Sequence, residues 1–435
     1  MNNTFELNPV FSGLKPSSTL YINEAVNKLW KQGEQVFHMG FGESRFDVHP
    51  LIQQAICEHA DKKSYLPARG LPQLIDTVAA YHSQKLNINF DSSQVIIGPG
   101  SKSLIYGLQM VLNADVFLPT PSWVSYAPQA HLLGGTCFKI PSSPNDNYRF
   151  NIAELDTLIK ASNNPNKLLI LNTPNNPSGE VFSAQLLEGI AEYCRANNIL
   201  VLSDEIYFQV CFGKTKHVSI AQFYPEGTII TGGLSKHLSL GGWRVGVGLL
   251  PDTEFGRQLM NKMVVYCSET WSGVAAPIQY AAITAYSLND DVEEYISNCV
   301  DIHRIRTEFI RQQLTDLGVR CSGGGGAFYS TVNFDQYATQ LSAIGVNTSS
   351  QLANHLLTHY RIASLPGDDF GIPDGILSVR LSTSYLDMEN DSDPQRLFSL
   401  YKTGIDEQEF MSKQHHPNTH QAIEAFSLLL SKLTS

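Results

Sequence analysis

Features that would place the chain in several special classes of protein are missing from its 435 residues. No apolar stretch approaches the roughly 20 residues needed to cross a bilayer, and the N-terminus lacks the basic segment and apolar core of a secretory signal. The seven cysteines are scattered, without the paired spacing of a zinc site or a disulfide framework. We therefore expect a cytoplasmic protein with reduced thiols, no membrane partner and no metal.

An excess of positive charge is also missing. The chain has 30 Lys and Arg residues and 41 Asp and Glu residues, which gives a formal net charge of -11. This balance argues against a nucleic-acid partner. Hydrophobic residues make up 43% and charged residues 16% of the chain, as in ordinary soluble globular proteins. Because a chain of this length exceeds the size at which one core keeps growing, we expect two domains.

Short apolar runs alternate with helical periodicity between residues 50 and 300. The runs are QVIIG, DVFLP, KLLILN, ILVLSDE, TIITGG and VGVGLLP. They predict an α/β fold, a three-layer α/β/α domain whose sheet is mostly parallel. Later segments, including GGGGAFYSTVNF and ILSVRLSTS, predict a smaller α+β domain. We assign residues 1–49 to an N-terminal arm and the first part of the small domain, residues 50–300 to the large domain, and residues 301–435 to the rest of the small domain.

A polar stretch from Asp387 to His420 separates the last predicted strand from a final amphipathic helix, QAIEAFSLLLSKL. We interpret the stretch as an inserted loop or a partly helical excursion of unknown function. His415 and His416 lie next to each other within it, before a proline. A metal site needs several converging ligands, so two adjacent histidines indicate a solvated loop more than a metal site.

Three residues near the middle of the chain indicate a cofactor. Lys236 lies in SKHLSLGGWRVG, eight residues before Arg244, and Asp204 ends an apolar run in SDEIY. A lysine that forms a Schiff base, an acid that pairs with a pyridinium nitrogen and an arginine that grips a phosphate are the groups that pyridoxal 5'-phosphate needs. This trio therefore favours pyridoxal 5'-phosphate as the cofactor.

A phosphate site is predicted where VIIGPGSKSLIYGLQ passes from a strand to a helix. Gly100 ends the glycine-containing turn, and Ser101 and Lys102 open the helix. Backbone N–H groups and the helix dipole make such a start favourable for an anion. Strand-to-helix turns often contain Gly and Ser for structural reasons alone. Arg244 would add a forked cation suited to phosphate.

Other side chains fit the pyridine ring. Trp123 follows the run DVFLP, where its face could stack on the ring, although an aromatic residue at such a position, taken alone, more often belongs to the core. Asn176, in NTPNNPSG, and Tyr207, three residues after Asp204, are suited to donating to the phenolate oxygen of the ring. The donation from Tyr207 would lower the pKa of the Schiff base. A buried Asp204 needs a cationic partner, and the pyridinium N–H is one.

Arg380 lies at the centre of the strand-like run ILSVRLSTS. Burying a guanidinium there is costly unless a carboxylate meets it, and the α-carboxylate of an amino acid would do so in bidentate fashion. An internal ion pair with Asp or Glu is the alternative. Gly42, in MGFGESRF, would allow the backbone to approach the same carboxylate closely.

From about Lys15 to Ser384 the order and spacing of these motifs resemble the class I/II aminotransferase family, fold-type I enzymes that depend on pyridoxal 5'-phosphate. The motifs that carry the resemblance are LKPSSTLYINEAVNKLWKQGEQVFHMGFGES, SYLPARGLPQL, PTPSWVSY, NTPNNPSG, SDEIY, LSKHLSLGGWRVG and VRLSTS. The resemblance implies transfer of an amino group from an L-amino acid to a 2-oxo acid. It implies that Lys236 forms the Schiff base and then moves a proton between Cα and C4', and that Asp204 keeps the ring nitrogen protonated.

The resemblance also implies a homodimer with shared active sites, in which Tyr65 reaches the phosphate bound by the partner subunit. The implied catalytic residues are Lys236, Asp204 and Tyr207. The implied cofactor-binding residues are Gly100, Ser101, Lys102, Trp123, Asn176, Asp204, Tyr207, Ser235, Lys236, Arg244 and Tyr65. The implied substrate-binding residues are Gly42, Asn176 and Arg380.

The chain departs from the family pattern at three places. The usual Gly-Glu-Pro-Asp segment is Gly42–Arg45 here, with the sequence Gly-Glu-Ser-Arg, so a proline is lost and an acid has become a base. Gly233 replaces a serine that commonly donates to the phosphate, and Ser178 replaces a threonine. Cofactor binding should survive, because Arg244 and the helix start remain.

The substrate is not fixed by these motifs. Arg45, Arg69, His38 and His49 are the candidates that could face the cleft and choose it. An arginine in the cleft would favour a dicarboxylic or otherwise anionic substrate, whereas arginines on the surface would leave an aromatic or neutral amino acid equally plausible. We favour a surface position for Arg45 and leave Arg69 open.

Two other functions compete with transamination. The same residues serve elimination and carbon–carbon bond formation in specialised biosynthesis, and the altered Gly42–Arg45 segment keeps these reactions open. A non-catalytic sensor on this fold is the other alternative. Sensors of that kind resemble fusions with a DNA-binding helix-turn-helix, but here only about fifteen residues precede the resemblance and no basic segment suits DNA.

Overall fold

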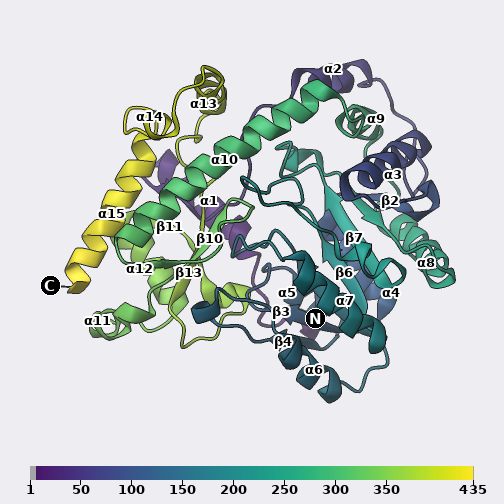
Figure 1. The fold of residues 1–435 in the computed structure, drawn as a ribbon, viewed down its shortest axis with the longest axis horizontal. Coiled ribbons are helices and arrows are strands. Elements are labelled where there is room, and N and C mark those ends of the chain that lie inside the picture. The colour runs from purple at the N-terminus through teal and green to yellow at the C-terminus, as the bar shows by residue number, and fades with distance from the viewer. Residues whose placement is uncertain (1–5, 435) are drawn as a thin grey trace, which may run out of the picture.

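The computed structural model describes residues 6–434 as two lobes, the larger of which is built around a seven-stranded sheet (Figure 1). The sheet has seven strands in the order β2-β8-β7-β6-β5-β3-β4. All neighbouring pairs are parallel except those that β8 makes with β2 and β7. The strands are β2 (Val95–Gly98), β3 (Asp115–Pro119), β4 (Cys137–Ile140), β5 (Lys167–Asn172), β6 (Leu200–Asp204), β7 (Thr228–Gly233) and β8 (Gly246–Leu249).

Helices cover both faces of this sheet, as the alternating pattern predicts. One face packs against α4 (Ser101–Leu112), α5 (Tyr126–Leu132) and α8 (Glu254–Thr270). The other face packs against α2 (Pro50–Glu58), α3 (Pro72–Leu86), α6 (Ile152–Ala161), α7 (Ala184–Ala196) and α9 (Ala276–Ala285). The strands are buried on both sides, which explains why they read as continuous apolar runs.

The smaller lobe is built around a second sheet, ordered β12-β13-β10-β9. Its strands are β9 (Arg320–Cys321), β10 (Tyr329–Asn333), β12 (Leu365–Pro366) and β13 (Ser378–Ser382). The helices that pack on this sheet are the long α10 (Asp290–Asp316), α11 (Ala338–Ala343), α12 (Ser349–Tyr360) and α15 (Pro417–Thr434). A separate apolar cluster fills the space between the sheet and these helices.

The beginning of the chain lies within the smaller lobe. β1 (Phe37–His38) pairs in parallel with β11 (Ile362–Ala363), and α1 (Ser18–Lys31) contacts β12. The segment from residue 39 to 49 then crosses to α2 of the large lobe. This path places Gly42 between the two lobes.

The stretch from Asp387 to His420 is a packed part of the smaller lobe rather than a solvated loop. It contains α13 (Asp393–Lys402) and α14 (Glu407–Phe410). Leu397 and Phe410 belong to an apolar cluster with residues of α10. His416 is completely buried, and its Nδ1 lies 2.9 Å from the carbonyl oxygen of Phe410. The expectation of a solvated loop is therefore wrong for His416, because the surrounding helices close over it.

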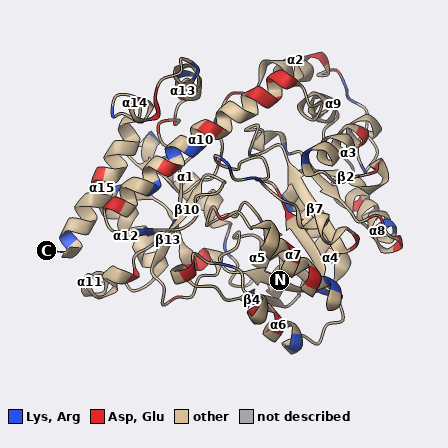
Figure 2. Ribbon diagram, viewed as in Figure 1, with Lys and Arg blue, Asp and Glu red and all other residues tan. Residues whose placement is uncertain are grey.

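Charges of both signs are mixed over the two lobes, and α10 carries acidic and basic residues along its length (Figure 2). The local sign of a site is consequently set by the few residues that line it, not by the net charge. Among residues 6–434, no helix is both long enough and apolar enough to span a membrane.

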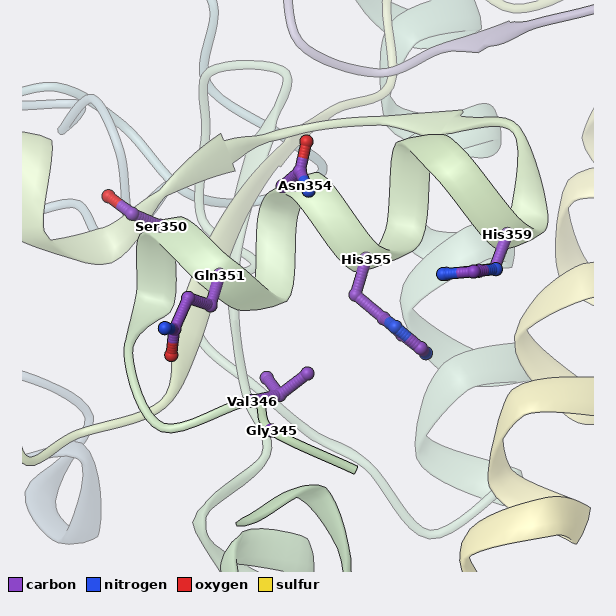
Figure 3. Close-up of a pocket in the computed structure, with 7 residues that line it drawn as sticks. All are labelled: Gly345, Val346, Ser350, Gln351, Asn354, His355 and His359. Carbon is purple, nitrogen blue, oxygen red and sulfur yellow. The ribbon is translucent and has the colours of Figure 1, made fainter. Parts of the chain in front are cut away.

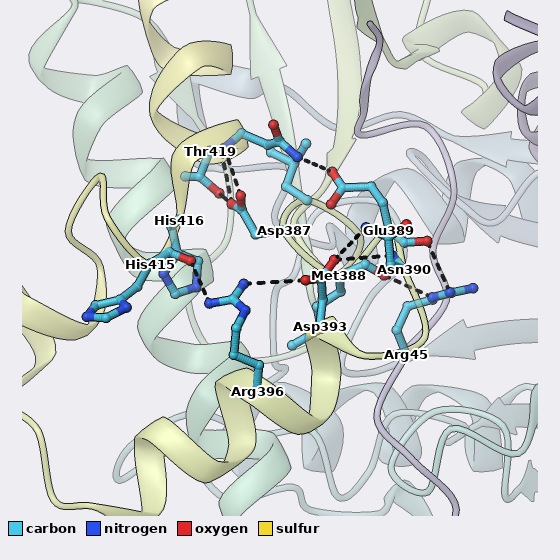
Figure 4. A network of polar contacts seen from close by, with 12 residues as sticks. Arg45, Asp387, Met388, Glu389, Asn390, Asp393, Arg396, His415, His416 and Thr419 are labelled. Carbon is cyan, nitrogen blue, oxygen red and sulfur yellow. Dashed lines mark hydrogen bonds and ion pairs between the residues drawn. The ribbon is translucent and has the colours of Figure 1, made fainter. Parts of the chain in front are cut away.

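Asp387 connects the inserted stretch to the start of α15 (Figure 4). Its buried carboxylate accepts from the backbone N–H of Asn418 at 2.7 Å, from that of Thr419 at 3.0 Å and from the Thr419 hydroxyl at 2.6 Å. Asp387→Ala would remove these charge-assisted bonds and is expected to lower the free energy of unfolding by about 2 kcal/mol. Denaturant unfolding measures the loss. Asp252→Ala, on the surface, is the control, and an equal loss in both variants would contradict this role.

Candidate active site

One cavity of about 520 Å³ lies where the two lobes meet, and we call it the cleft. It gathers side chains from the carboxyl ends of β5 and β6, the start of α4, the loop after β7, and β10 and β13 of the smaller lobe. The predicted site residues that line it are Gly42, Ser101, Lys102, Trp123, Asn176, Asp204, Tyr207, Ser235, Lys236, Arg244 and Arg380. Residues far apart in the sequence thus converge on one space.

Two predicted residues do not line the cleft. Gly100 lies directly behind it, next to the guanidinium of Arg244. Tyr65 is 95% exposed on the surface of this chain, outside the cleft. An exposed tyrosine cannot act on the site of its own chain from that position.

Lys236 projects into the cleft from the loop that follows β7. Its Nζ donates to the carbonyl oxygen of Gly42 at 2.7 Å and lies 5.4 Å from the centre of the Tyr207 ring. Within the described residues it forms no ion pair. The amine is therefore held only by a neutral acceptor and remains available for chemistry.

Asp204 ends β6, and only 3% of its surface is exposed. Its Oδ2 accepts from the Tyr126 hydroxyl at 2.7 Å, and its Oδ1 accepts from the backbone N–H of Ile206 at 3.3 Å. Burial raises the pKa of Asp204 to about 6, and these two hydrogen bonds and Lys236 only partly oppose that effect. A buried carboxylate without a cation in contact calls for a cationic ligand group.

Tyr126 was not among the predicted site residues. It lies three residues after Trp123, at the start of α5, and its ring packs edge-on against the Trp123 ring. Burial raises the pKa of the Tyr126 phenol, so its hydroxyl stays a donor to Asp204. The spacing Trp-x-x-Tyr was the only signal in the sequence, since residues three apart lie on one side of a helix start.

Tyr329 was missed as well. It lies on β10, and its hydroxyl is 2.7 Å from that of Tyr207 and 3.3 Å from the carbonyl oxygen of Gly42, to which it can donate. Burial raises the pKa of Tyr207, and the neighbouring Tyr329 raises it further. The Tyr207 phenol therefore remains protonated. No local pattern in GGGGAFYST distinguishes this tyrosine, because its partners lie more than a hundred residues away.

The start of α4 forms a cradle for an anion. Gly100, the N-cap residue, has φ +85° and offers no side chain to cap the first N–H groups of the helix. A Cβ at Gly100 would collide with the Arg244 guanidinium, so glycine is required for this close approach. Arg244 donates to the carbonyl oxygen of Gly241 at 2.8 Å and remains exposed on the cleft side. Free N–H groups and a guanidinium are the donors that a phosphate takes.

Lys102 and Trp123 lie together beside this cradle. The Lys102 Nζ is 4.9 Å from the centre of the Trp123 ring. Burial lowers the pKa of Lys102, and the positive charges of Arg244 and Lys236 lower it further. An anion bound in the cleft would raise the pKa of Lys102 and so oppose the effect of Arg244 and Lys236.

Arg380 is a buried cation on β13, with 1% of its surface exposed. It donates to the carbonyl oxygen of Gly40 and to Oδ1 of Asn176, the latter at 3.3 Å. Its Nε has no hydrogen-bond partner among the described residues, and no described carboxylate lies within ion-pair distance of the guanidinium. Within residues 6–434, Arg380 therefore does not form the internal ion pair with Asp or Glu that was the alternative. The site is instead open to an anionic ligand.

None of the four candidates for substrate choice lines the cleft. Arg69 donates to the carbonyl oxygens of Val95 and Ser92, so the possibility that it faces the cleft is wrong. Arg45 is turned towards residues 385–391 and is only partly exposed (Figure 4). The buried His38 contacts Asn23, and His49 caps α2. Each side chain satisfies nearby backbone or polar groups, which local sequence does not reveal.

A smaller cavity, of about 310 Å³, lies on α12 and shares no residue with the cleft. His355 and His359 extend from the same side of the helix, with ring centres 4.6 Å apart (Figure 3). A cluster of three or more side chains able to hold a metal ion is not found within residues 6–434. This second cavity therefore adds nothing to the chemistry of the cleft.

Comparison with known proteins identifies the family. Residues 34–392 match the family model for aminotransferase class I and II. The chain belongs to the class I and II aminotransferase family. It is thus a transferase of the fold-type I group, which confirms the predicted fold class and the prediction of an aminotransferase.

Relatives in this aminotransferase family match the chain along most of its length. The aspartate aminotransferase of Geobacillus stearothermophilus is 32% identical over 380 residues, 85% of this chain and 92% of that enzyme. The asparagine–oxo-acid transaminase of Streptococcus mutans is 30% identical over 379 residues, with the same two shares. The structure of Thermus thermophilus aspartate aminotransferase with maleate has a TM-score of 0.82 at 22% identity, covering 98% of this chain and 100% of that one, and shows the shared fold.

Membership in the family implies pyridoxal 5'-phosphate, and the cleft fits that group. The amine of Lys236, the buried carboxylate of Asp204 without a cation in contact, and the uncapped start of α4 beside Arg244 all open into the same space. These are the partners that an aldehyde, a pyridine nitrogen and a phosphate require. The cleft therefore offers groups suited to the aldehyde, the ring nitrogen and the phosphate of the cofactor.

The raised pKa of Asp204 predicts a pH-dependent stability for the cofactor-free protein. Burial moves this pKa from 3.8 to about 6, so the folded protein holds the proton more tightly than the unfolded chain. The group therefore favours folding at low pH, and this contribution is lost as the pH rises through about 6. Asp204→Asn does not titrate. Relative to the unmodified protein, its free energy of unfolding should rise by up to about 3 kcal/mol between pH 4 and 7.

Denaturant unfolding at several pH values measures this difference. Asp252→Asn changes a solvated carboxylate and serves as the control. A difference between Asp204→Asn and the unmodified protein that stays constant with pH would contradict the prediction.

Proposed function

We propose that this aminotransferase uses Lys236 as its catalytic amine and moves an amino group from a small anionic L-amino acid, with aspartate as the first candidate, to a 2-oxo acid. The observation that carries the proposal is the buried guanidinium of Arg380, which faces the cleft without a described carboxylate partner. An α-carboxylate would neutralise it. The names of the relatives, aspartate aminotransferase and asparagine–oxo-acid transaminase, support the substrate class.

The charge of the cleft also supports an anionic substrate. Its lining contains four cationic side chains and two carboxylates, those of Glu43 and Asp204. The cations are Lys102, Lys236, Arg244 and Arg380. The net lining charge of +2 suits a phosphate and the α-carboxylate of a substrate.

When bound, pyridoxal 5'-phosphate supplies an aldehyde that condenses with amines and a protonated ring that withdraws electrons from Cα of the substrate. In the proposed arrangement, the N–H groups at the start of α4, Ser101, Ser235 and Arg244 hold the phosphate. Asp204, supported by Tyr126, pairs with the ring nitrogen and keeps it protonated. Trp123 packs against the ring.

The remaining residues handle the phenolate oxygen, the substrate and the proton. Asn176 and Tyr207 donate to the phenolate oxygen, and the Tyr329 hydroxyl then gives its one proton to Tyr207, 2.7 Å away, instead of to the Gly42 carbonyl oxygen. Arg380 and the backbone of Gly42 hold the α-carboxylate, which aims the hydrogen on Cα. Lys236 Nζ would then take this proton and return it at C4' of the cofactor, the carbon on the other side of the substrate nitrogen. The proton thus stays on one amine inside the cleft.

We further propose a cytoplasmic homodimer. Tyr65 is almost fully exposed and lies outside the cleft of its own chain, as expected for a residue that serves the partner subunit. All seven cysteines are free thiols, which suits a reducing compartment. We also propose the domain division predicted above, and the pairing of β1 with β11, which joins residues 1–49 to the C-terminal lobe, supports it.

Half-reactions with an amino-acid panel test the proposed function. The holoenzyme, incubated with L-aspartate and no oxo acid, should convert stoichiometrically to its amino form, seen in the cofactor spectrum. Lys236→Ala should slow this conversion by at least about 10⁴-fold, because no other amine is placed to move the proton. Continued turnover without an acceptor would instead indicate elimination, the alternative that the altered Gly42–Arg45 segment raises. Full activity of Lys236→Ala would contradict a catalytic role for this lysine.

A further inference from the structure

Residues 42–45 form a strap between the cleft and the smaller lobe, and we call them the strap. The Gly42 carbonyl oxygen accepts from Lys236 Nζ at 2.7 Å. The hydroxyl of Ser44 lies 2.7 Å from that of Ser239, in the loop after Lys236, and 3.0 Å from Nε2 of His303 on α10. A Cβ at Gly42 would collide with the Tyr329 hydroxyl, so the strap packs directly against that side chain.

Arg45 fastens the other end of the strap to residues 385–391 (Figure 4). Its Nε donates to the carbonyl oxygen of Met388 at 3.1 Å, and its two Nη atoms donate to the Tyr385 hydroxyl at 3.3 Å, the Glu389 carbonyl oxygen at 3.4 Å and the Asp391 carboxylate at 3.3 Å. The guanidinium also lies 4.9 Å from the centre of the Tyr385 ring. All three nitrogens of the fork are used, which a lysine could not reproduce.

Residues 385–391 are themselves firmly held. They follow β13, the strand that carries Arg380, after only two residues. The buried Arg306 of α10 donates to the carbonyl oxygens of Ser384 and Leu386. Asp387 accepts three hydrogen bonds from the start of α15. Arg45 therefore joins the strap to a fixed support rather than to a free loop.

We propose that Arg45 is a positioning residue that sets the distance between Gly42 and Arg380, the two groups assigned to the α-carboxylate. The inference rests on the proposed function. Arg45 links the chain just after Gly42 to the chain just after Arg380, so the two α-carboxylate groups are joined by a short route outside the cleft. The packed stretch that includes residues 387–391 acquires a role as the anchor of that link. Small misplacements of groups that orient a substrate are costly.

Arg45→Met and Arg45→Lys test the inference in the holoenzyme. Arg45→Met should raise KM for the amino acid and for the oxo acid together by about tenfold, since both carry the carboxylate, and leave kcat within about twofold. Its affinity for α-methyl-L-aspartate, which has no hydrogen on Cα to transfer, should fall by the same factor in a spectral titration. Arg45→Lys keeps the charge but not the fork and should restore only part of the affinity.

Arg304→Met is the matched control. Arg304 lies on α10, its side chain is 15% exposed compared with 20% for Arg45, and it pairs with Asp301, Glu308 and Glu407 away from the cleft. This variant should lose stability without a change in KM or in affinity for α-methyl-L-aspartate. Equal shifts in the Arg45 and Arg304 variants, or unchanged affinity in Arg45→Met, would overturn the positioning role.

Hydrogen exchange separates this inference from the proposed function. In the holoenzyme without substrate, Arg45→Met should speed exchange of the amides in residues 40–45, and Arg304→Met should not. An unmodified protein that fails to bind α-methyl-L-aspartate would contradict the proposed substrate. The exchange rates would still decide the role of Arg45: unchanged protection of the strap in Arg45→Met would overturn it.

Discussion

Two buried charges without a described counter-ion in contact govern the site, the carboxylate of Asp204 and the guanidinium of Arg380. Both open into the same cleft, from opposite lobes. A protein tolerates such burial when a ligand supplies the missing charges. A group with a cationic ring nitrogen and a substrate with a carboxylate supply one each, which links the chemistry of both proposed ligands to the electrostatics of the cleft.

The architecture explains how these charges are held apart and aimed. Asp204 ends a central parallel strand, where polar side chains emerge together from the sheet. Arg380 comes from the middle of a strand in the smaller lobe, and the centres of the Tyr329 and Phe370 rings lie 4.8 and 5.3 Å from its guanidinium. Lys236 lines the same cleft, from the loop after β7. The reacting atoms of a bound substrate would therefore lie at the junction of the two lobes.

Local motifs predicted the parts of the site that depend on local geometry. The apolar runs predict a mostly parallel sheet. This prediction was enough to place Asp204, Trp123 and Asn176, which lie at or just after the ends of such runs, at one edge of the sheet. Tyr126 and Tyr329 were missed because their importance lies in hydroxyl contacts made across the fold. The position of Arg69 could not be decided from the sequence, because a guanidinium can donate to backbone carbonyl oxygens as readily as to a ligand. The burial of His416 depends on helices that pack only in three dimensions.

Covalent labelling of the holoenzyme tests the central claim most directly. Borohydride reduction fixes the cofactor to the amine that holds it, and peptide mass measurement then locates the modified lysine. We predict the pyridoxyl phosphate increment on the peptide that contains Lys236 and on no other. Attachment to Lys102, the other lysine that lines the cleft, or to a lysine outside it would contradict the assignment of the catalytic amine and the orientation of the ring between Asp204 and Arg380.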